Sequence, residues 1–173
     1  VDFLEKGPKV RTKRIRVLVA FGDISNFGVW TRRGSNSPEG FKTFMVDVYR
    51  EFIKFRNGNH YFMKLMGDGF MAVCEITPKN QKRKTLDFVY HANHLVNSIH
   101  NLIEKTFPKP GGFRLRVVAG HVLKLYATQR NNDRRQQIDY LGYPINLGAR
   151  LLDVGRQFPL LCHESIKKIL NGK

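Results

Sequence analysis

The chain has 173 residues and a mass of 20.1 kDa, which suits one domain that can bury a core without disulfides or a structural metal. Hydrophobic residues make up 42% and charged residues 25%, an ordinary globular composition that excludes intrinsic disorder. Thirty Lys and Arg residues against 14 Asp and Glu give a formal charge of +16, so we expect an anionic partner such as nucleic acid, anionic lipid or a nucleoside triphosphate.

The first half of the chain divides into a basic arm and the start of a single domain. Residues 1–14 are polar and basic and are expected to form the arm, and residues 15–173 the domain. An apolar run over 15–21, interrupted only by Arg16 and rich in β-branched residues, is typical of a buried central strand. Helical spacing of apolar residues and a Gly67-Asp68-Gly69 turn then predict three further elements. These are a helix over 39–56 and two hairpin strands over 61–66 and 70–76.

The second half alternates helical and strand patterns in the same way. The expected elements are a helix over 86–107, strands over 114–119, 122–126 and 137–141, a helix over 144–153, a strand over 159–162 and a helix over 164–170. Pro144 is well placed as the first residue of its helix. The order of strands and helices predicts an α+β fold with a mostly antiparallel sheet flanked by helices.

The cysteines and the apolar segments bear on where the protein works. Cys74 and Cys162 are the only cysteines, which excludes a disulfide-rich secreted scaffold, and neither has the His and Asn neighbours of a thiol nucleophile. No apolar run is long enough to span a bilayer, and no signal peptide is recognised. We therefore expect a cytoplasmic protein.

Two acidic residues follow or join predicted strands. Asp23 comes after the first strand, and Asp68 lies in the hairpin turn. If these strands are neighbours, the carboxylates share one sheet edge, where at about 4 Å they would repel by roughly 4 kcal/mol at an effective dielectric of 20. Such oxygen ligands suit Mg²⁺ or Mn²⁺ carrying a phosphate. Taken alone, the spacing favours two ordinary turn residues.

Three more polar residues could contact the same ligand. Lys64, four residues before Asp68, could reach a ligand oxygen or ring nitrogen, although an edge-strand lysine that prevents aggregation is the simpler interpretation. Asn146 and Arg150 are four residues apart on the predicted helix and share one face. An amide beside a guanidinium could orient a sugar and bind the charge of a pentavalent phosphorane, and an ordinary solvated helix face also fits.

Three separated motifs together resemble the catalytic domain of class III nucleotide cyclases. The motifs are Val17-Leu-Val-Ala-Phe-Gly-Asp23-Ile-Ser-Asn-Phe27, Lys64-Leu-Met-Gly-Asp68-Gly-Phe-Met-Ala72 and Asp139-Tyr-Leu-Gly-Tyr-Pro-Ile-Asn146-Leu-Gly-Ala-Arg150-Leu. They occur in the family's order over roughly residues 15–165, and the agreement of all three outweighs the simpler interpretation of each. The resemblance implies a ferredoxin-like core and a head-to-tail homodimer with two active sites at its interface.

The resemblance also implies which residues bind metal and phosphate. Asp23 and Asp68 match the two metal-binding aspartates, with the carbonyl of Ile24 as a backbone ligand, so two Mn²⁺ or Mg²⁺ ions are expected at each site. The loop expected to wrap the triphosphate consists of Ser25, Asn26, Phe27 and Gly28. Many members carry a phosphate-binding lysine in a terminal hairpin. Here we expect either that Arg32 or Arg33 of the unusually basic loop 28–37, or an N-terminal lysine, replaces it, or that the hairpin lies outside the sequence given.

The remaining motif residues match the positions for base recognition and catalysis. Lys64 and Asp139 occupy the base-recognition positions. Asn146 and Arg150 match the pair that orients the ribose and stabilises the transition state, contributed by the other protomer.

The base itself is not settled by these positions. Lys64 with Asp139 is the pair that usually reads adenine in the family, which keeps an adenylate cyclase open as the alternative. However, the segment Asp-Ile-Ser-Asn-Phe-Gly-Val-Trp-Thr-Arg-Arg over residues 23–33 is most similar to the stand-alone pyrimidine cyclases of bacterial Pycsar anti-phage systems. Tyr49 could narrow a base pocket against purines, or could be a core or interface tyrosine. We expect UTP, then CTP, as substrate, giving cyclic UMP or cyclic CMP for a separate effector.

A basic RNA-binding module with a ferredoxin-like sheet is the alternative from another class, since a pI near 10.2 fits it. No strand carries the Gly-aromatic pattern of such modules, and paired acids repel phosphate unless metal is bound. A polymerase palm or a diguanylate cyclase shares the two-acid hairpin but not the motif from Asp139 to Arg150. We therefore expect neither a nucleic-acid partner nor a membrane partner.

Overall fold

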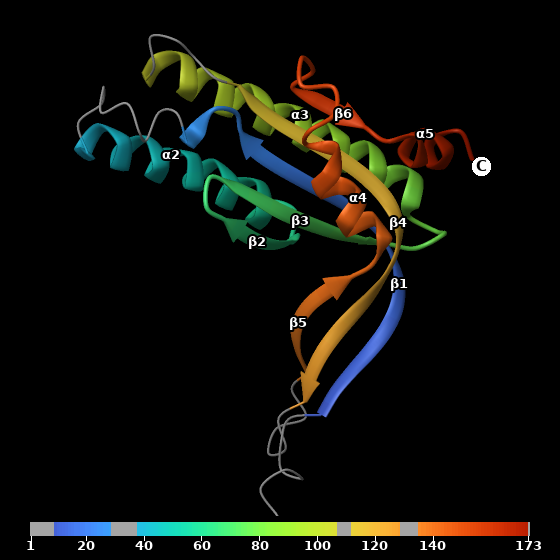
Figure 1. Cartoon of the computed structure of the whole chain (residues 1–173). Coiled ribbons are helices and arrows are strands. Elements are labelled where there is room, and N and C mark those ends of the chain that lie inside the picture. Colours follow the sequence, from blue (N-terminus) through green and yellow to red (C-terminus); the bar gives the residue numbers. More distant parts are fainter. Residues whose placement is uncertain (1–8, 29–37, 107–111, 129–134, 173) are drawn as a thin grey trace, which may run out of the picture.

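A sheet with the strand order β2-β3-β1-β4-β5, and with β6 beside β4, forms the centre of the computed structural model (Figure 1). The structure describes residues 9–28, 38–106, 112–128 and 135–172. The strands are β1 (Lys9–Ile24), β2 (Phe62–Met66), β3 (Gly69–Ile76), β4 (Phe113–Thr128), β5 (Arg135–Leu141) and β6 (Leu160–Cys162). All described pairings are antiparallel except that of β4 with β6.

Helices cover the two faces of this sheet unequally. They are α2 (Pro38–Asn57), α3 (Gln81–Thr106), α4 (Tyr143–Leu151) and α5 (Glu164–Leu170). Figure 1 shows α2 and α3 together on one face and the short α4 on the other. The expected α+β fold, with a mostly antiparallel sheet flanked by helices, is confirmed. No helix among the described residues combines the length and apolar character that a bilayer crossing requires.

The apolar run of β1 is explained by burial on both faces. Leu18 and Ala20 belong to the core under α2 and α3, whereas Val17, Val19 and Phe21 belong to the cluster on the α4 face. Because side chains alternate across a strand, a strand covered on both sides needs apolar residues at every position. The prediction of a buried central strand is therefore confirmed.

Two strands are longer than their sequences predict. β1 begins at Lys9, not Ile15, because residues 9–14 pair with residues 123–128 of β4, so this part of the expected arm is strand; residues 1–8 lie outside the described part. The expected strands over 114–119 and 122–126 are one continuous β4. Gly120 does not break it, since its missing side chain admits Pro144 of α4, whose Cγ would lie 2.5 Å from a Cβ there. Figure 1 shows the ends of β1, β4 and β5 projecting beyond the helices.

A buried arginine fixes α4 against the sheet. Arg116 of β4 is fully buried and donates five hydrogen bonds of 2.9–3.1 Å to carbonyl oxygens. The acceptors lie at the end of α4, in the loop after it and on β4 itself, namely Leu151, Val154, Gly155, Phe158 and Leu115. Burial lowers the pKa of Arg116, and the neighbouring charge of Arg114 lowers it further. These carbonyls therefore stabilise a charge that the protein interior otherwise disfavours.

Replacing Arg116 by Met should destabilise the fold. An Arg116→Met variant keeps the apolar stem but leaves several carbonyls without a donor, so we expect the free energy of unfolding to fall by about 3 kcal/mol or more. Urea denaturation measures this. Arg83→Met is the matched control, because Arg83 is exposed in a loose pair with Asp87, and should change stability by less than about 0.5 kcal/mol. Equal small effects in both variants would contradict the anchoring role.

Candidate active site

The two strand-end acids lie at the same edge of the sheet. Asp23 is opposite Gly69 in the pairing of β1 with β3, and Asp68 directly precedes Gly69 in the β2–β3 turn. The strands approach so closely that a Cβ at Gly69 would collide with the carbonyl of Gly22. Burial raises the pKa of Asp68, and the charge of Asp23 raises it further. The structure thus brings the two carboxylates close enough to interact.

Arg114 of β4 joins this acid pair, and the sequence analysis did not identify it. Its Nη2 donates to Asp23 Oδ2 at 2.8 Å, and its Nη1 donates to the carbonyl of Leu152 at 3.0 Å. The sequence contains a signal for it, because Arg114 and Arg116 are two arginines on one face of an otherwise apolar strand. Arg114 therefore links Asp23 to the end of α4.

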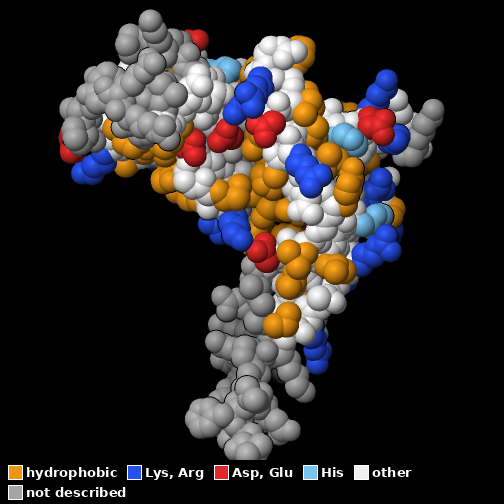
Figure 2. Space-filling view, viewed as in Figure 1, with side chains coloured by type: hydrophobic (Ala, Val, Ile, Leu, Met, Phe, Trp, Pro, Cys, Tyr) orange, Lys and Arg blue, Asp and Glu red, His pale blue; other side chains and the backbone are white. Residues whose placement is uncertain are grey.

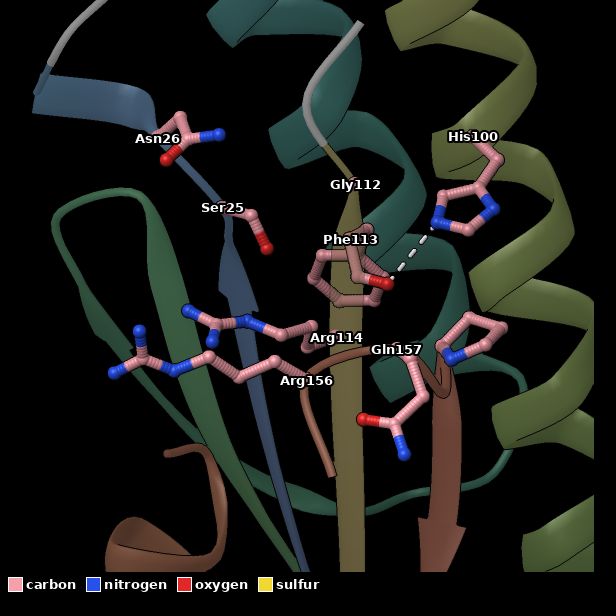
Figure 3. Close-up of a pocket in the computed structure, with 9 residues that line it drawn as sticks. Ser25, Asn26, His100, Gly112, Phe113, Arg114, Arg156 and Gln157 are labelled. Carbon is pink, nitrogen blue, oxygen red and sulfur yellow. Dashed lines mark hydrogen bonds between the residues drawn. The ribbon is translucent and has the colours of Figure 1, made fainter. Parts of the chain in front are cut away.

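A cavity of about 460 Å³ opens beside Asp23. Its lining includes Ser25 and Asn26 of the loop expected to bind phosphate, together with Arg114 and Arg156. Figure 3 shows the side chains of the two arginines extending in the same direction from β4 and from the loop before β6. The loop is held on β4 because the Ser25 N–H donates to the carbonyl of Gly112 at 2.7 Å. Two guanidinium groups beside exposed backbone suit an anionic ligand.

The rest of that loop is placed only in part. The ring of Phe27 lies 5.4 Å from the ring of Phe41 of α2 and packs against the main core, so its side chain supports the loop from beneath. A Cβ at Gly28 would meet nothing within 4 Å. Arg32 and Arg33 lie outside the described residues.

Lys64 and Asp139 meet although 75 residues separate them. Lys64 Nζ donates to Asp139 Oδ2 at 2.9 Å, joining β2 to β5. Burial opposes the charge of Asp139, but hydrogen bonds from Lys64 and from the Tyr140 N–H hold its pKa below the ordinary value. The two residues therefore form an ion pair between the two outer strands.

Tyr49 lies at the turn that carries Asp68, and Asn146 and Arg150 lie on α4. The Tyr49 hydroxyl donates to the carbonyl of Gly67 at 2.7 Å, so this side chain contacts the turn that carries Asp68. Asn146 and Arg150 are exposed on α4. α4 can lie this close because Gly148 faces Phe21, whose Cδ2 would be 2.6 Å from a Cβ there. The packing of one side of α4 leaves Asn146 and Arg150 on a free face.

The acid pair has the chemistry of a magnesium or manganese site. No group of three or more His, Cys, Asp or Glu side chains within ligand range occurs in the described part of the chain, which argues against a closed zinc cage there. Mg²⁺ and Mn²⁺ instead bind through one or two carboxylates and take their other ligands from water and substrate phosphate. Asp23 and Asp68, with the Ile24 carbonyl beside them, fit that requirement, since burial and mutual repulsion leave Asp68 in need of a cation.

The acid pair predicts how stability responds to pH and to Mn²⁺. Because the pKa of Asp68 is raised on folding, the contribution of Asp68 to wild-type stability falls as pH rises through that pKa. We expect Asp68→Asn to melt about 2 °C higher than wild type at pH 7 without metal, and this gain to shrink near pH 4. Added Mn²⁺ should raise the melting temperature of wild type but not of the variant.

Asp47→Asn is the control for this thermal melting series, because Asp47 pairs with Arg50 on the exposed surface of α2. It should keep the full Mn²⁺ response. An equal Mn²⁺ response in Asp68→Asn would contradict the assignment of Asp68 to a metal site.

Comparisons with known proteins bear on the family and the fold. A family model described as the adenylate and guanylate cyclase catalytic domain matches residues 10–173. The adenylyl cyclase CyaB from P. aeruginosa superimposes with a TM-score of 0.75 at 17% identity, covering 94% of this chain and 83% of that one. The guanylyl cyclase Cya2 gives a TM-score of 0.68 at 13% identity, covering 95% and 80%.

A further similar structure is the guanylate cyclase domain of RhGC from Catenaria anguillulae in complex with GTP. It has a TM-score of 0.57 at 20% identity, covering 93% of this chain and 85% of that chain. At these identities the structural likeness concerns the fold. No curated protein matches the chain.

Proposed function

The chain belongs to the family of adenylate and guanylate cyclase catalytic domains, whose model matches residues 10–173, and we propose that its substrate is a pyrimidine nucleoside triphosphate, UTP ahead of CTP. As a nucleotide cyclase it forms a 3′,5′-cyclic nucleotide and releases pyrophosphate. Three observations carry the site assignment: Arg114 binds Asp23, the charge of Asp23 acts on Asp68, and Arg114 and Arg156 line one cavity.

In the proposed reaction the ribose 3′-oxygen attacks the α-phosphorus as the bond to the β-phosphate oxygen breaks. Asp23 and Asp68 would hold divalent metal, which would acidify the ribose 3′-hydroxyl and neutralise phosphate charge. Asn146 orients the ribose, and Arg150 stabilises the charge that grows on the α-phosphate. The released proton passes to solvent and the pyrophosphate leaves. No protein nucleophile takes part.

The triphosphate is proposed to occupy the cavity beside Asp23. Arg114 both binds that aspartate and lines the cavity, so its charge is available to the β- and γ-phosphates. Arg156 lies in the same lining and pairs with Asp153 at 3.1 Å on an exposed surface, a weak pair that a phosphate can displace. Arg156 can thus offer a second positive charge to the phosphates.

The active unit is proposed to be a head-to-tail homodimer. Asn146 and Arg150 are exposed on α4, and large apolar side chains of α4, β2, β4 and β5 are exposed as well. They include Leu65, Met66, Leu123, Leu141 and Tyr143. Figure 2 shows hydrophobic side chains gathered on the face that carries α4 and β5. An apolar area of this kind marks a protein interface, which would bring one protomer's Arg150 to its partner's acids.

Two observations bear on the base. The segment over residues 23–33 supports a pyrimidine cyclase making cyclic UMP or cyclic CMP for an anti-phage effector, and Tyr49 lies against the Asp68 turn, where it could limit the room for a base. The contact of Lys64 with Asp139 favours an adenylate cyclase as the second candidate, because that pair usually reads adenine in the family.

Turnover with each of the four triphosphates tests the base. Purified protein with Mn²⁺ and ATP, GTP, CTP or UTP should release cyclic UMP, and cyclic CMP more slowly, as read by mass spectrometry. Cyclic AMP as the main product would contradict the pyrimidine proposal and support the adenylate cyclase. An Asp68→Ala variant should form no cyclic product from any of them. If it instead bound RNA more tightly while wild type made no product, the protein would be a nucleic-acid-binding module.

Mixing two inactive variants tests the shared active site. Asp68→Ala and Arg150→Ala should each lack activity. An equal mixture should regain about a quarter of wild-type activity, because half of the dimers formed at random are mixed and each mixed dimer has one intact site. Steady-state product formation in the mixture measures this. Absence of recovery after subunit exchange, which labelled protomers can verify, would contradict an active site built from two chains.

A further inference from the structure

The two outer strands of the main sheet path touch each other. β2 and β5 stand at opposite ends of the order β2-β3-β1-β4-β5, and a flat sheet would separate them by about 19 Å, four steps of about 4.8 Å. Yet the ring centroids of Phe62 and Tyr140 are 5.1 Å apart, and Lys64 binds Asp139 at 2.9 Å. The sheet therefore curls over its α4 face, and the base-recognition pair exists only because of that curl.

A charged and aromatic cluster holds β5 in this position. The Tyr140 hydroxyl donates to Glu75 Oε1 of β3 at 2.9 Å, and the Lys124 ammonium of β4 donates to the same oxygen. Tyr140 is only 2% exposed, and Lys124 lies over the Tyr126 and Tyr140 rings at 5.2 and 5.9 Å from their centroids. Burial opposes the charge of Glu75, but hydrogen bonds from Lys124 and Tyr140 hold its pKa below the ordinary value. Glu75 thus connects β5 to β3, although these two strands do not pair in the sheet.

The position of Tyr140 sets the direction of the Asp139 carboxylate. The Tyr140 N–H donates to Asp139 Oδ1 at 2.8 Å, while Oδ2 receives Lys64. The β4–β5 register shifts between Leu125 and Tyr126, directly before Asp139 pairs. A bulge there re-aims the side chains that follow it. The carboxylate is therefore oriented by its own strand, and that strand is oriented by Glu75.

We propose that Glu75 and Tyr140 are positioning residues that set base selectivity by fixing Asp139 opposite Lys64. This inference rests on the proposed function, because it needs Lys64 and Asp139 to contact the base. Neither Glu75 nor Tyr140 touches the substrate in this scheme. They act through the orientation of one carboxylate, so their loss should change which base is preferred more than the rate of the chemical step.

A Tyr140→Phe variant removes the hydroxyl and keeps the ring that packs on Phe62. We define selectivity as kcat/KM for the preferred triphosphate divided by kcat/KM for the least preferred one. In this variant the selectivity should fall about two- to tenfold, which is the loss expected for one hydrogen bond. The change should appear mainly in KM. Tyr126→Phe is the matched control, since its ring lies under the same lysine, and should keep the wild-type ratio. In an Asp139→Asn background, Tyr140→Phe should have no further effect on the ratio.

Glu75→Gln is a second variant. It tests the positioning role if thermal melting shows that Tyr140→Phe is not folded. It keeps an acceptor for Tyr140 but loses the ion pair with Lys124, and should lower the same ratio. An unchanged ratio in an active, folded Tyr140→Phe protein, or an equal loss in the Asp139→Asn background, would overturn the positioning role and leave the cyclase proposal intact. A wild-type protein that cyclises none of the four triphosphates would overturn both.

Discussion

The position of α4 against β4 depends on one buried guanidinium group. Arg116 has no exposed surface and directs its donors at carbonyls near the end of α4 and in the loop after it. A cation is favoured there because the carbonyls at a helix C-terminus carry partial negative charge. The exposed face of α4, with Asn146 and Arg150, and the loop that carries Arg156 are both held by this anchor. The positions of the candidate catalytic face and of one wall of the cavity therefore both depend on Arg116.

Arg114 extends the same arrangement to the acid pair. Two residues before Arg116 on β4, it binds the carbonyl of Leu152 and the carboxylate of Asp23 together. Arg116 thus stabilises a helix end, and Arg114 partly neutralises the acid pair. In that pair, the charged form of Asp68 is disfavoured by burial and by the charge of Asp23. A protein of formal charge +16 uses its arginines here for positioning as well as for attracting an anion.

Local patterns predicted the fold well where one physical cause acts on one segment. The apolar run of β1, the Gly-Asp-Gly hairpin and the helix over 164–170 lie where the sequence places them. The strand lengths were wrong where polar segments pair with each other, as residues 9–14 do with β4, because exposed strand ends lack an apolar face. Gly120 suggested a break in β4 but instead serves close packing with Pro144.

The sequence alone determined the class of the site: two acids at strand ends, a lysine before one of them, and an Asn and an Arg on one helix face, in an order that resembles a cyclase. It determined this because turn residues and helical spacing act over a few residues. Only the tertiary structure decided that Arg114 binds Asp23 across 91 residues and that Lys64 meets Asp139 across 75. Those contacts depend on strand register and on the curl of the sheet, which arise from the packing of both faces rather than from any single segment.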